Sequence, residues 1–193
     1  MIKALKYAAI FSGAITFIDI VGGPAVVQGS SMEPTLNPPD SVINDVVWLN
    51  RFAAKTGSIQ RGDIITIYCP TEPNEMHIKR VIGLPGDFIF TDSSGLNTVK
   101  VPPGHCWVEG DNRLPFTSTS SSGFKRTWTS KDSNVYGPVS LGLVDSRVSW
   151  VVFPFHRVRH LKSTEPEKSR FLLKGKFDDV AESLIKASSQ SHN

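Results

Sequence analysis

The 193-residue chain has few residues of the kinds that bind metals or cross-link a fold. Its two cysteines, Cys69 and Cys106, lie in separate apolar runs, where buried free thiols are more common than a disulfide. No group of cysteines and histidines has the spacing of zinc ligands. We therefore expect two buried thiols, with a disulfide as the alternative, and we expect no metal and no cofactor.

A strong excess of one charge is lacking as well. The chain has 21 Lys and Arg residues against 18 Asp and Glu residues, a net charge of +3, and the basic residues are scattered. Nucleic-acid surfaces are usually concentrated basic patches, so we expect no nucleic-acid partner. Internal repeats are absent too, and the length suits one domain with its own core.

The only long apolar run lies at the amino terminus. Residues 7–27 contain a single charged residue, Asp19, and two lysines precede them. A helix rises ~1.5 Å per residue, so about twenty residues cross a bilayer core of ~30 Å. The Gly22-Gly23-Pro24 break predicts that the helix ends near Val21. We predict a membrane anchor over residues 1–23, and the positive-inside rule places the rest of the chain across the membrane.

Two alternatives to the anchor stay open. A cleaved secretory signal also has a basic start and an apolar stretch, and its cleavage site would fall near Val21-Gly22-Gly23. A buried core helix is the second alternative. Asp19 counts against a clean span, because an ionisable group costs ~2.5–3.5 kcal/mol at the centre of the bilayer. Near the far end of the span, Asp19 would reach the headgroups or face a partner helix.

After Pro24 the chain changes to short apolar runs separated by Gly, Pro, Asn and Asp, which is typical of a mainly β domain. We predict that residues 24–160 form one β body. Its expected strands cover residues 41–49, 64–69, 76–82, 88–91, 98–101, 105–109 and 148–153.

Two segments differ from this body. Residues 114–129 are rich in Ser and Thr and contain the basic pair Lys125-Arg126, which predicts an exposed, mobile loop insertion. Residues 161–193 are polar and predict a carboxy-terminal tail. Within the tail, apolar residues recur at helical spacing and predict a short amphipathic helix; they are Phe177, Val180, Ala181, Leu184 and Ile185.

A candidate nucleophile, Ser31, lies directly after the apolar run. A serine needs a nearby base to become a nucleophile, and His or Lys are the usual bases. Histidines follow Ser31 in the sequence, but none lies in a recognisable triad setting, and no Gly-x-Ser-x-Gly elbow is present. A Ser-His-Asp site stays an alternative, because the members of a triad meet in space and not in sequence.

Lys79 is the other candidate base. Side chains alternate along the predicted strand 76–82, so His77, Lys79 and Val81 share one face and Arg80 points to the other. Burial would favour the neutral amine, which could accept the proton of a serine hydroxyl. In the alternative interpretation, Lys79 and Arg80 both belong to a solvated face.

The motifs around these residues resemble those of the type I signal peptidases. Four boxes occur in the family's order after an amino-terminal apolar segment, and together they extend to about residue 154. The boxes are Ser31-Met32-Glu33-Pro34-Thr35-Leu36, Arg61-Gly62-Asp63-Ile64-Ile65, Lys79-Arg80-Val81-Ile82-Gly83-Leu84-Pro85-Gly86-Asp87, and Gly110-Asp111-Asn112 followed by Ser130-Lys131-Asp132-Ser133-Asn134.

The resemblance implies a Ser-Lys dyad on a mainly β fold of the signal-peptidase and repressor-protease type. Ser31 would be the nucleophile, because the box places the nucleophile directly before the methionine, and Ser30 is its rival. Lys79 would be the general base. The Ser31 backbone N–H would help to stabilise the oxyanion. Gly29 occupies the place where some bacterial relatives carry a second, hydroxyl donor.

The last box contains further implied roles and one departure. Ser130 and Asp132 fall on family positions that brace the lysine and the fold. The box reads Asp132-Ser133-Asn134 where the family usually has Asp-Ser-Arg, and the Asn form is similar to that of the mitochondrial branch of the family. Residues 114–129 make the chain longer here than the family needs.

The resemblance implies a membrane-bound serine endopeptidase that removes sorting or signal peptides from precursor polypeptides. For the mitochondrial branch it implies a single-pass protein of the mitochondrial inner membrane, anchored in lipid by its amino-terminal helix. The catalytic domain would face the intermembrane space, beside a related catalytic subunit in a heterodimer. The peptide would bind extended in a narrow groove, with small residues just before the cut. The alternatives are a bacterial-type signal peptidase, a self-cleaving repressor-type protease, and a non-catalytic subunit that stabilises a partner protease.

Overall fold

A computed structural model describes residues 7, 12–13, 20–91, 98–112, 116–119, 125–128, 130–165 and 171–172. Most of the predicted anchor and the whole predicted tail helix lie outside these residues. Within the described part of the chain, no helix is both long and apolar enough to cross a membrane. Ile20 and Val21 are the last helical residues before the first strand begins at Gly22, so the helix ends where the sequence predicts.

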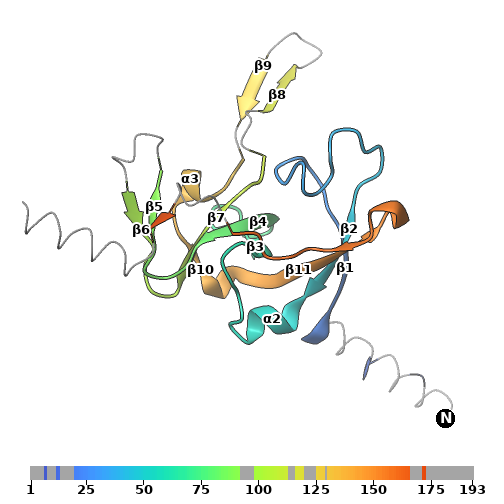
Figure 1. The fold of residues 1–193 in the computed structure, drawn as a ribbon, viewed down its shortest axis with the longest axis horizontal. Coiled ribbons are helices and arrows are strands. Elements are labelled where there is room, and N and C mark those ends of the chain that lie inside the picture. Colours follow the sequence, from blue (N-terminus) through green and yellow to red (C-terminus); the bar gives the residue numbers. More distant parts are fainter. Residues whose placement is uncertain are drawn as a thin grey trace, which may run out of the picture.

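The body is mainly β, as predicted, and is built around one curled antiparallel sheet (Figure 1). A late strand, β11, lies in the middle of this sheet and pairs with two early strands, β2 and β3. The strands follow the order β1 (Gly22–Val26), β2 (Val46–Asn50), β11 (Val144–Phe153), β3 (Ile64–Tyr68), β4 (Met76–Gly83), β7 (His105–Glu109) and β10 (Val139–Ser140), and β12 (Arg159–His160) also pairs with β11.

Two smaller sheets and four short helical segments complete the described structure. One sheet has the order β13 (Phe171–Leu172), β5 (Phe88–Phe90), β6 (Thr98–Lys100), and the other is a hairpin of β8 (Phe116–Thr119) and β9 (Lys125–Trp128). The helical segments are α2 (Arg51–Lys55), α3 (Ser133–Tyr136), η1 (Leu141–Leu143) and η2 (Phe155–Arg157).

Several predicted boundaries are wrong. The segment 114–129 was expected to be a loop, but it contains the β8–β9 hairpin. The segment from residue 161 was expected to be a tail, but β13 lies within it and pairs with β5. The segment 41–49 was expected to be one strand, but β2 begins only at Val46, because the preceding Asp45 is buried and binds other parts of its loop.

The first strand was not predicted at all. The Gly22-Gly23-Pro24 sequence was interpreted as a break between anchor and body, but these residues belong to β1. β1 is an edge strand with a partner on one side only, and an edge strand tolerates proline because one row of its backbone groups needs no ladder partner. The body therefore begins at Gly22, two residues before the predicted boundary.

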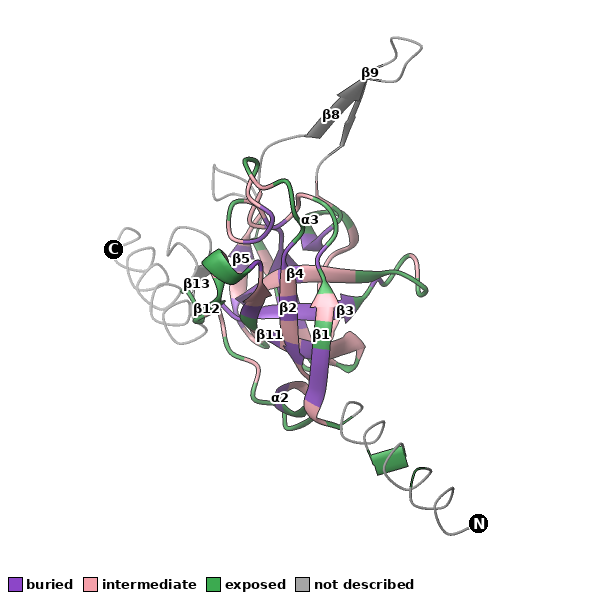
Figure 2. Cartoon of the chain, turned by 90° about the vertical axis from the view of Figure 1, so that its right-hand side faces the viewer, coloured by how far each residue is buried: buried purple, intermediate pink, exposed green. Residues whose placement is uncertain are grey.

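The core lies on both faces of the central strand β3. Ile64 packs into one cluster with residues of the first sequence box and of β2. Ile65 and Ile67 pack into a second cluster with residues of β4, β7 and β10. Such two-sided burial explains the nearly continuous apolar sequence of β3. Figure 2 shows these buried residues concentrated at the centre of the body.

The two cysteines are free and buried, which confirms the first of the two interpretations above. Burial raises the pKa of the Cys106 thiol to about 12. Because the thiolate is the reactive form, Cys106 is inert at neutral pH.

Candidate active site

Ser31 lies in the irregular segment 27–45 that joins β1 to β2, which we call the nucleophile loop. Two apolar side chains of its box hold the loop down, because Met32 and Leu36 are both buried in a core cluster. Backbone hydrogen bonds close a turn around the serine, from Glu33 N to Ser30 O (3.1 Å) and from Leu36 N to Met32 O (2.9 Å). The loop is therefore fixed on both sides of Ser31 without any helix or strand.

Lys79 reaches the same place from β4. The predicted alternation holds, since Lys79 and Val81 are buried on one face and the Arg80 side chain points to the other. Only 4% of Lys79 is exposed, so the alternative of a solvated face is wrong for this residue. Its partner in the neighbouring strand β3 is Ile65, a fully buried residue, so the lysine lies next to an apolar side chain.

The structure brings the two predicted site residues together. Lys79 Nζ lies 3.0 Å from Ser31 Oγ, within hydrogen-bond distance. Burial lowers the pKa of Lys79 from its ordinary value of 10.5 to about 8, although the charges of Asp132, Cys69 and Asp111 act in the opposite direction. A neutral amine is therefore available in a useful fraction near neutral pH, and it can accept a proton from the Ser31 hydroxyl.

The geometry selects between the rival residues. Ser30 contributes its carbonyl oxygen to hydrogen bonds with Glu33 N and Asn112 Nδ2, and only Ser31 contacts the lysine amine. No histidine in the described part of the chain is hydrogen-bonded to Ser31. His77, on the same face as Lys79, instead contacts the Glu75 carboxylate at 3.3 Å. The dyad of Ser31 and Lys79 is thus the arrangement that the fold provides.

The Gly110-Asp111-Asn112 motif packs directly against the nucleophile loop. The Asn112 N–H donates to Ser31 O at 3.0 Å, and its side-chain amide donates to Ser30 O and to the Glu33 carboxylate, each at 3.2 Å. A Cβ at Gly110 would lie 2.5 Å from Ser31 O, closer than atoms can approach. Glycine is required here, because only its bare backbone allows this approach. The motif was recognised from sequence, but this role was not.

The second half of the last box fixes β7 and the Gly110 turn. Asp132 caps α3 by accepting from Asn134 N (3.1 Å), and its other oxygen accepts from Gly110 N (3.1 Å). Ser133 Oγ accepts from the backbone N–H of Val108 in β7 (2.9 Å). Asp132 thus braces the fold and also acts on Lys79 through its charge, as the resemblance implies.

Ser130 differs from this expectation. Its hydroxyl oxygen is buried and has no hydrogen-bond partner among the described residues, so it makes no bond to Lys79. The nearby backbone of Gly110 lies close to it, since a Cβ there would come within 2.7 Å of Ser130 Oγ. The bracing of the lysine that the resemblance implies for Ser130 is not made in this structure.

Arg80 has a structural task on the opposite face of β4. Its Nε and Nη2 donate to the two oxygens of Asp111 at 2.7 and 2.6 Å, and its Nη1 donates to Gly62 O at 2.8 Å. A bidentate pair of this kind is both strong and specific in direction. Arg80 therefore joins the second, third and fourth sequence boxes into one unit behind Lys79.

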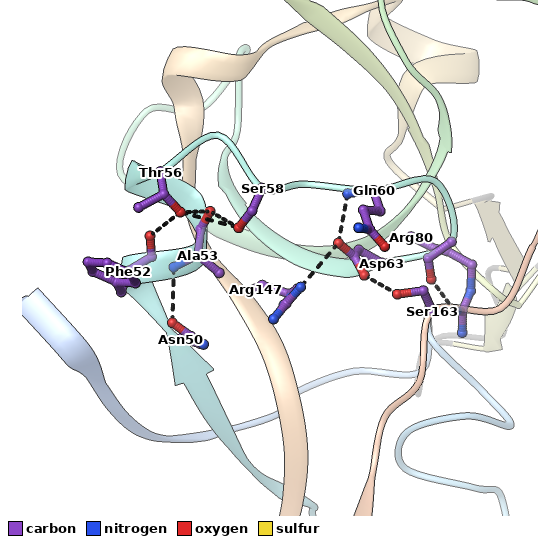
Figure 3. Close-up of polar contacts among 11 residues, drawn as sticks. Asn50, Phe52, Ala53, Thr56, Ser58, Gln60, Asp63, Arg80, Arg147 and Ser163 are labelled. Carbon is purple, nitrogen blue, oxygen red and sulfur yellow. Dashed lines mark hydrogen bonds and ion pairs between the residues drawn. The ribbon is translucent and has the colours of Figure 1, made fainter.

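The carboxy-terminal segment 161–165 covers that unit. Gly62 has a φ of +87°, and a Cβ there would lie 2.3 Å from Thr164 O, so only glycine fits under the segment. The Ser163 hydroxyl donates to the Asp63 carboxylate, which also accepts from Gln60 N and faces Arg147 (Figure 3). A cavity of about 510 Å³ lies between this segment and Arg80. These residues therefore belong to the body, not to a tail.

A groove of about 230 Å³ leads to the dyad. One wall is formed by residues 25–29, before the nucleophile, and the other by residues 76–79 of β4. In β4, the residues up to Lys79 pair with β3 on one side, and pairing with β7 on the other side begins only at Arg80. Among the described residues, the groove is thus bordered by a strand edge without a partner strand, which can hydrogen-bond to an extended peptide.

The described part of the chain holds no group of three or more His, Cys, Asp or Glu residues arranged to bind a metal ion. The residues of the groove can carry out acyl transfer, with a serine as nucleophile and a lysine as base.

Comparisons with known proteins identify the family to which the chain is similar. A family model described as "Signal peptidase, peptidase S26" matches residues 1–97. The chain is 39% identical over 171 residues to "Mitochondrial inner membrane protease subunit 2" of Danio rerio, covering 86% of each chain. It is 42% identical over 153 residues to the protein of the same name from Mus musculus, covering 79% of each. "Mitochondrial inner membrane protease subunit 1" of Mus musculus is 34% identical over 156 residues, 79% of this chain and 82% of that protein.

Proposed function

Since the chain belongs to the signal peptidase family, peptidase S26, we propose that it cleaves precursor polypeptides with Ser31 as nucleophile and Lys79 as general base. It is a hydrolase of the signal peptidase type, and it acts in mitochondria at the inner membrane. The mainly β body agrees with the fold that the sequence boxes imply.

One observation carries the assignment of the catalytic residues: the buried amine of Lys79 lies 3.0 Å from Ser31 Oγ. A lysine that serves only the fold would be paired with a carboxylate, as Arg80 is with Asp111. Lys79 has the serine hydroxyl as its close partner instead, and burial lowers its pKa to about 8. Both properties are those of a general base.

In the first half of the reaction, neutral Lys79 takes the proton from Ser31 Oγ as the oxygen attacks the scissile carbonyl carbon. The carbonyl oxygen becomes an oxyanion, and the Ser31 N–H, which has no partner among the described residues, is free to donate to it. The C–N bond then breaks, and the protonated lysine gives its proton to the leaving amine. The product is an ester between Ser31 and the amino-terminal part of the substrate.

In the second half, water replaces the amine. Lys79 is neutral again and removes a proton from a water molecule, which attacks the ester carbonyl. The tetrahedral intermediate collapses, Ser31 Oγ leaves, and Lys79 returns the proton to it. Both halves need a base at the same position, and burial lowers the pKa of the amine to about 8, so a fraction of it is neutral for each half.

The substrate lies extended in the groove between residues 25–29 and 76–79. Main-chain hydrogen bonds to the free strand edge would hold it, and alternate side chains would point toward the groove walls. The groove measures only about 230 Å³, and its lining includes four buried residues, Val27, Met32, Leu49 and Thr66. Such a groove favours small residues just before the cut.

The same proposal includes the topology and the partner. The amino-terminal apolar run anchors the chain as a single span, and the β body faces the intermembrane space, where the sorting signals of precursors emerge. The relatives are named as subunits 1 and 2 of one protease, and both types are similar to this chain. A related catalytic subunit is therefore the proposed partner.

The proposal is tested in mitochondrial membranes that contain the full chain. Ser31→Ala and Lys79→Met should each abolish processing of precursors, while Ser30→Ala, a matched change one residue away, should leave processing in place. Electrophoresis of labelled precursor and mature forms measures the result. If both dyad variants process precursors as well as the unmodified chain does, the hypothesis of a Ser31-Lys79 dyad is wrong. A non-catalytic role beside a partner protease then becomes the better interpretation.

A further inference from the structure

The nucleophile loop contains a polar network that neither the dyad nor the sequence boxes include. Asn37, near the middle of the loop, is 9% exposed, and Asp45, at its end, is fully buried. The two residues bind each other reciprocally, since Asn37 N donates to Asp45 Oδ2 (2.9 Å) and Asp45 N donates to Asn37 Oδ1 (2.8 Å). This pair closes residues 37–45 of the nucleophile loop into a ring, and Ser31 lies before this ring in the chain.

The Asn37 side chain also binds the segment before Ser31, which forms one wall of the groove, so in the chain Ser31 lies between Asn37 and the residues that Asn37 binds. Its Nδ2 donates to Val27 O at 2.9 Å and to Gly29 O at 3.1 Å. The N–H of Val27 donates in turn to Asp45 O at 2.8 Å. The carbonyl groups of the two neighbours of Gln28, and the N–H of Val27, are therefore hydrogen-bonded to Asn37 or Asp45 and point away from the groove.

Gln28 is left as the free residue of this wall. It lines the groove together with Gly29 and Ser31, and its own backbone N–H and C=O have no partner among the described residues. Gln28 is exposed, so its backbone groups are open to an extended peptide that enters the groove and can pair with it. The bonds of Asn37 to Val27 and Gly29 decide which way these groups point.

A cation from another part of the chain supports the network. Arg157 of η2 places Nη2 at 3.2 Å from Asp45 Oδ2. A fully buried carboxylate is stable only when a positive charge or strong donors face it, and Asn37 N and Arg157 do so here. The loop that carries the nucleophile is thus tied to the strand system through β11 and η2.

We propose that Asn37 is a positioning residue for the cleavage reaction. It holds Val27 and Gly29 so that the Gln28 backbone faces the peptide and Ser31 stays within reach of Lys79, with Asp45 and Arg157 keeping Asn37 in place. The inference rests on the proposed function, because it concerns the same dyad and the same groove. Asn37 touches neither the substrate nor the reacting atoms, and it acts through the loop.

Two substitutions separate the side-chain bonds from the backbone conformation. Asn37 has a φ of +48°, a left-handed conformation that glycine adopts without strain and serine does not. Asn37→Gly keeps the conformation and removes every side-chain bond, whereas Asn37→Ser keeps one hydroxyl that can bind one of the two carbonyls. The order of activity expected from the bonds is Asn, Ser, Gly, and the order expected from backbone strain puts Gly above Ser.

The experiment uses detergent-solubilised membranes with the full chain and a fluorescence-quenched peptide that has alanine at the first and third positions before the scissile bond. Asn37→Gly should lower kcat/KM by about 10- to 100-fold, with a higher KM and a lower kcat, because a small misplacement of reacting groups has an effect of this size. Asn37→Ser should lie between. The matched control is Asn44→Gly, since Asn44 is an exposed residue of the same loop, and it should keep both constants.

Thermal unfolding of each variant is measured in parallel, and rates are compared below the unfolding midpoint of the least stable one. If Asn37→Gly lowers the midpoint but keeps kcat and KM, or if it is more active than Asn37→Ser, the positioning role is wrong. Ser31→Ala separates the two hypotheses. Cleavage that survives Ser31→Ala contradicts the proposed function, and cleavage that is lost in Ser31→Ala but intact in Asn37→Gly contradicts the positioning role alone.

Discussion

Lys79 and Arg80 are consecutive residues of β4, yet the two faces of the strand treat their positive charges in opposite ways. On one face, Lys79 is 4% exposed, and its amine contacts the Ser31 hydroxyl. On the other, Arg80 forms two hydrogen bonds to Asp111 and one to the carbonyl of Gly62. Burial without a close counter-charge lowers the pKa of an amine and makes the amine available as a base, whereas a guanidinium stays charged and its bidentate pair with a carboxylate ties parts of the fold together. The proposed general base and a residue that stabilises the fold are thus neighbours in the sequence.

Exchange of the cation type should give the largest effect. Lys79→Arg introduces a guanidinium that stays charged and cannot accept a proton, so peptide cleavage should fall by about 10⁴-fold, the scale seen when a nucleophile loses its base. Arg80→Lys loses part of the bidentate pair but keeps a cation opposite Asp111, so cleavage per folded molecule should stay close to that of the unmodified chain. Initial rates, normalised by the folded fraction, measure both. If the two variants lost cleavage activity to a similar extent, the proposed difference in role between Lys79 and Arg80 would be wrong.

Removal of each cation should change stability in opposite directions. Lys79→Met removes a buried amine, and a pKa lowered from 10.5 to about 8 corresponds to a gain of up to about 3 kcal/mol in the free energy of unfolding at neutral pH. Arg80→Met leaves Asp111 as a largely buried charge without its partner and should cost about 3–5 kcal/mol. Denaturant unfolding at neutral pH measures both, and a loss in Lys79→Met as large as that in Arg80→Met would contradict the comparison.

The pH dependence of cleavage should follow Lys79 and not Arg80. Below its pKa of about 8 the amine is protonated and cannot act as a base, so the rate should rise with pH to a midpoint near 8. The unfolded chain holds this proton up to about pH 10.5, so stability should also rise with pH between about 8 and 10.5 in the unmodified chain, and this rise should be missing in Lys79→Met. A pH–rate profile that is flat across pH 8 would exclude a lysine base.

The smallest effect should come from a distant charge. Asp132 raises the pKa of Lys79, so Asp132→Asn should move the acidic limb of the pH–rate profile to lower pH. The same change weakens the cap of α3 and the bond to Gly110, which should cost about 1 kcal/mol of stability. Glu72→Gln is the matched control, because Glu72 is paired with Lys131 and does not act on Lys79. An acidic limb that moves equally in both variants would show a general effect of net charge.

The sequence predicted the elements whose pattern is local. The alternation of β4 assigned Lys79 and Arg80 to opposite faces, and the apolar run of β3 predicted a buried strand. It failed where the environment overrides composition. β1 contains two glycines and a proline, and an edge position accepts them. The segment 161–165 is polar and yet packs over Gly62, because its partners are backbone groups and Asp63, which leave no apolar signal in the sequence.

The candidate site was predicted in part. The residues of the dyad came from the resemblance of the boxes, and the choice of Ser31 over Ser30 agrees with the contact to Lys79. The role of Gly110 under Ser31 and the binding of Asn37 to Val27 and Gly29 were not predicted. Such contacts join residues through single atoms at short range, and no periodicity or spacing reports them.

The sequence by itself determined that the body is mainly β, that a serine follows an apolar amino-terminal run, and that a lysine lies in the middle of a strand with an apolar neighbour. Residue types and a period of two are enough for these properties. Only the tertiary structure decided that the amine of Lys79 is buried beside Ser31 with a lowered pKa, and that Arg80 is paired with Asp111 instead. A pKa depends on burial and on the nearest charges, and both are set by β3, β7 and the nucleophile loop, which converge on β4 from distant parts of the chain.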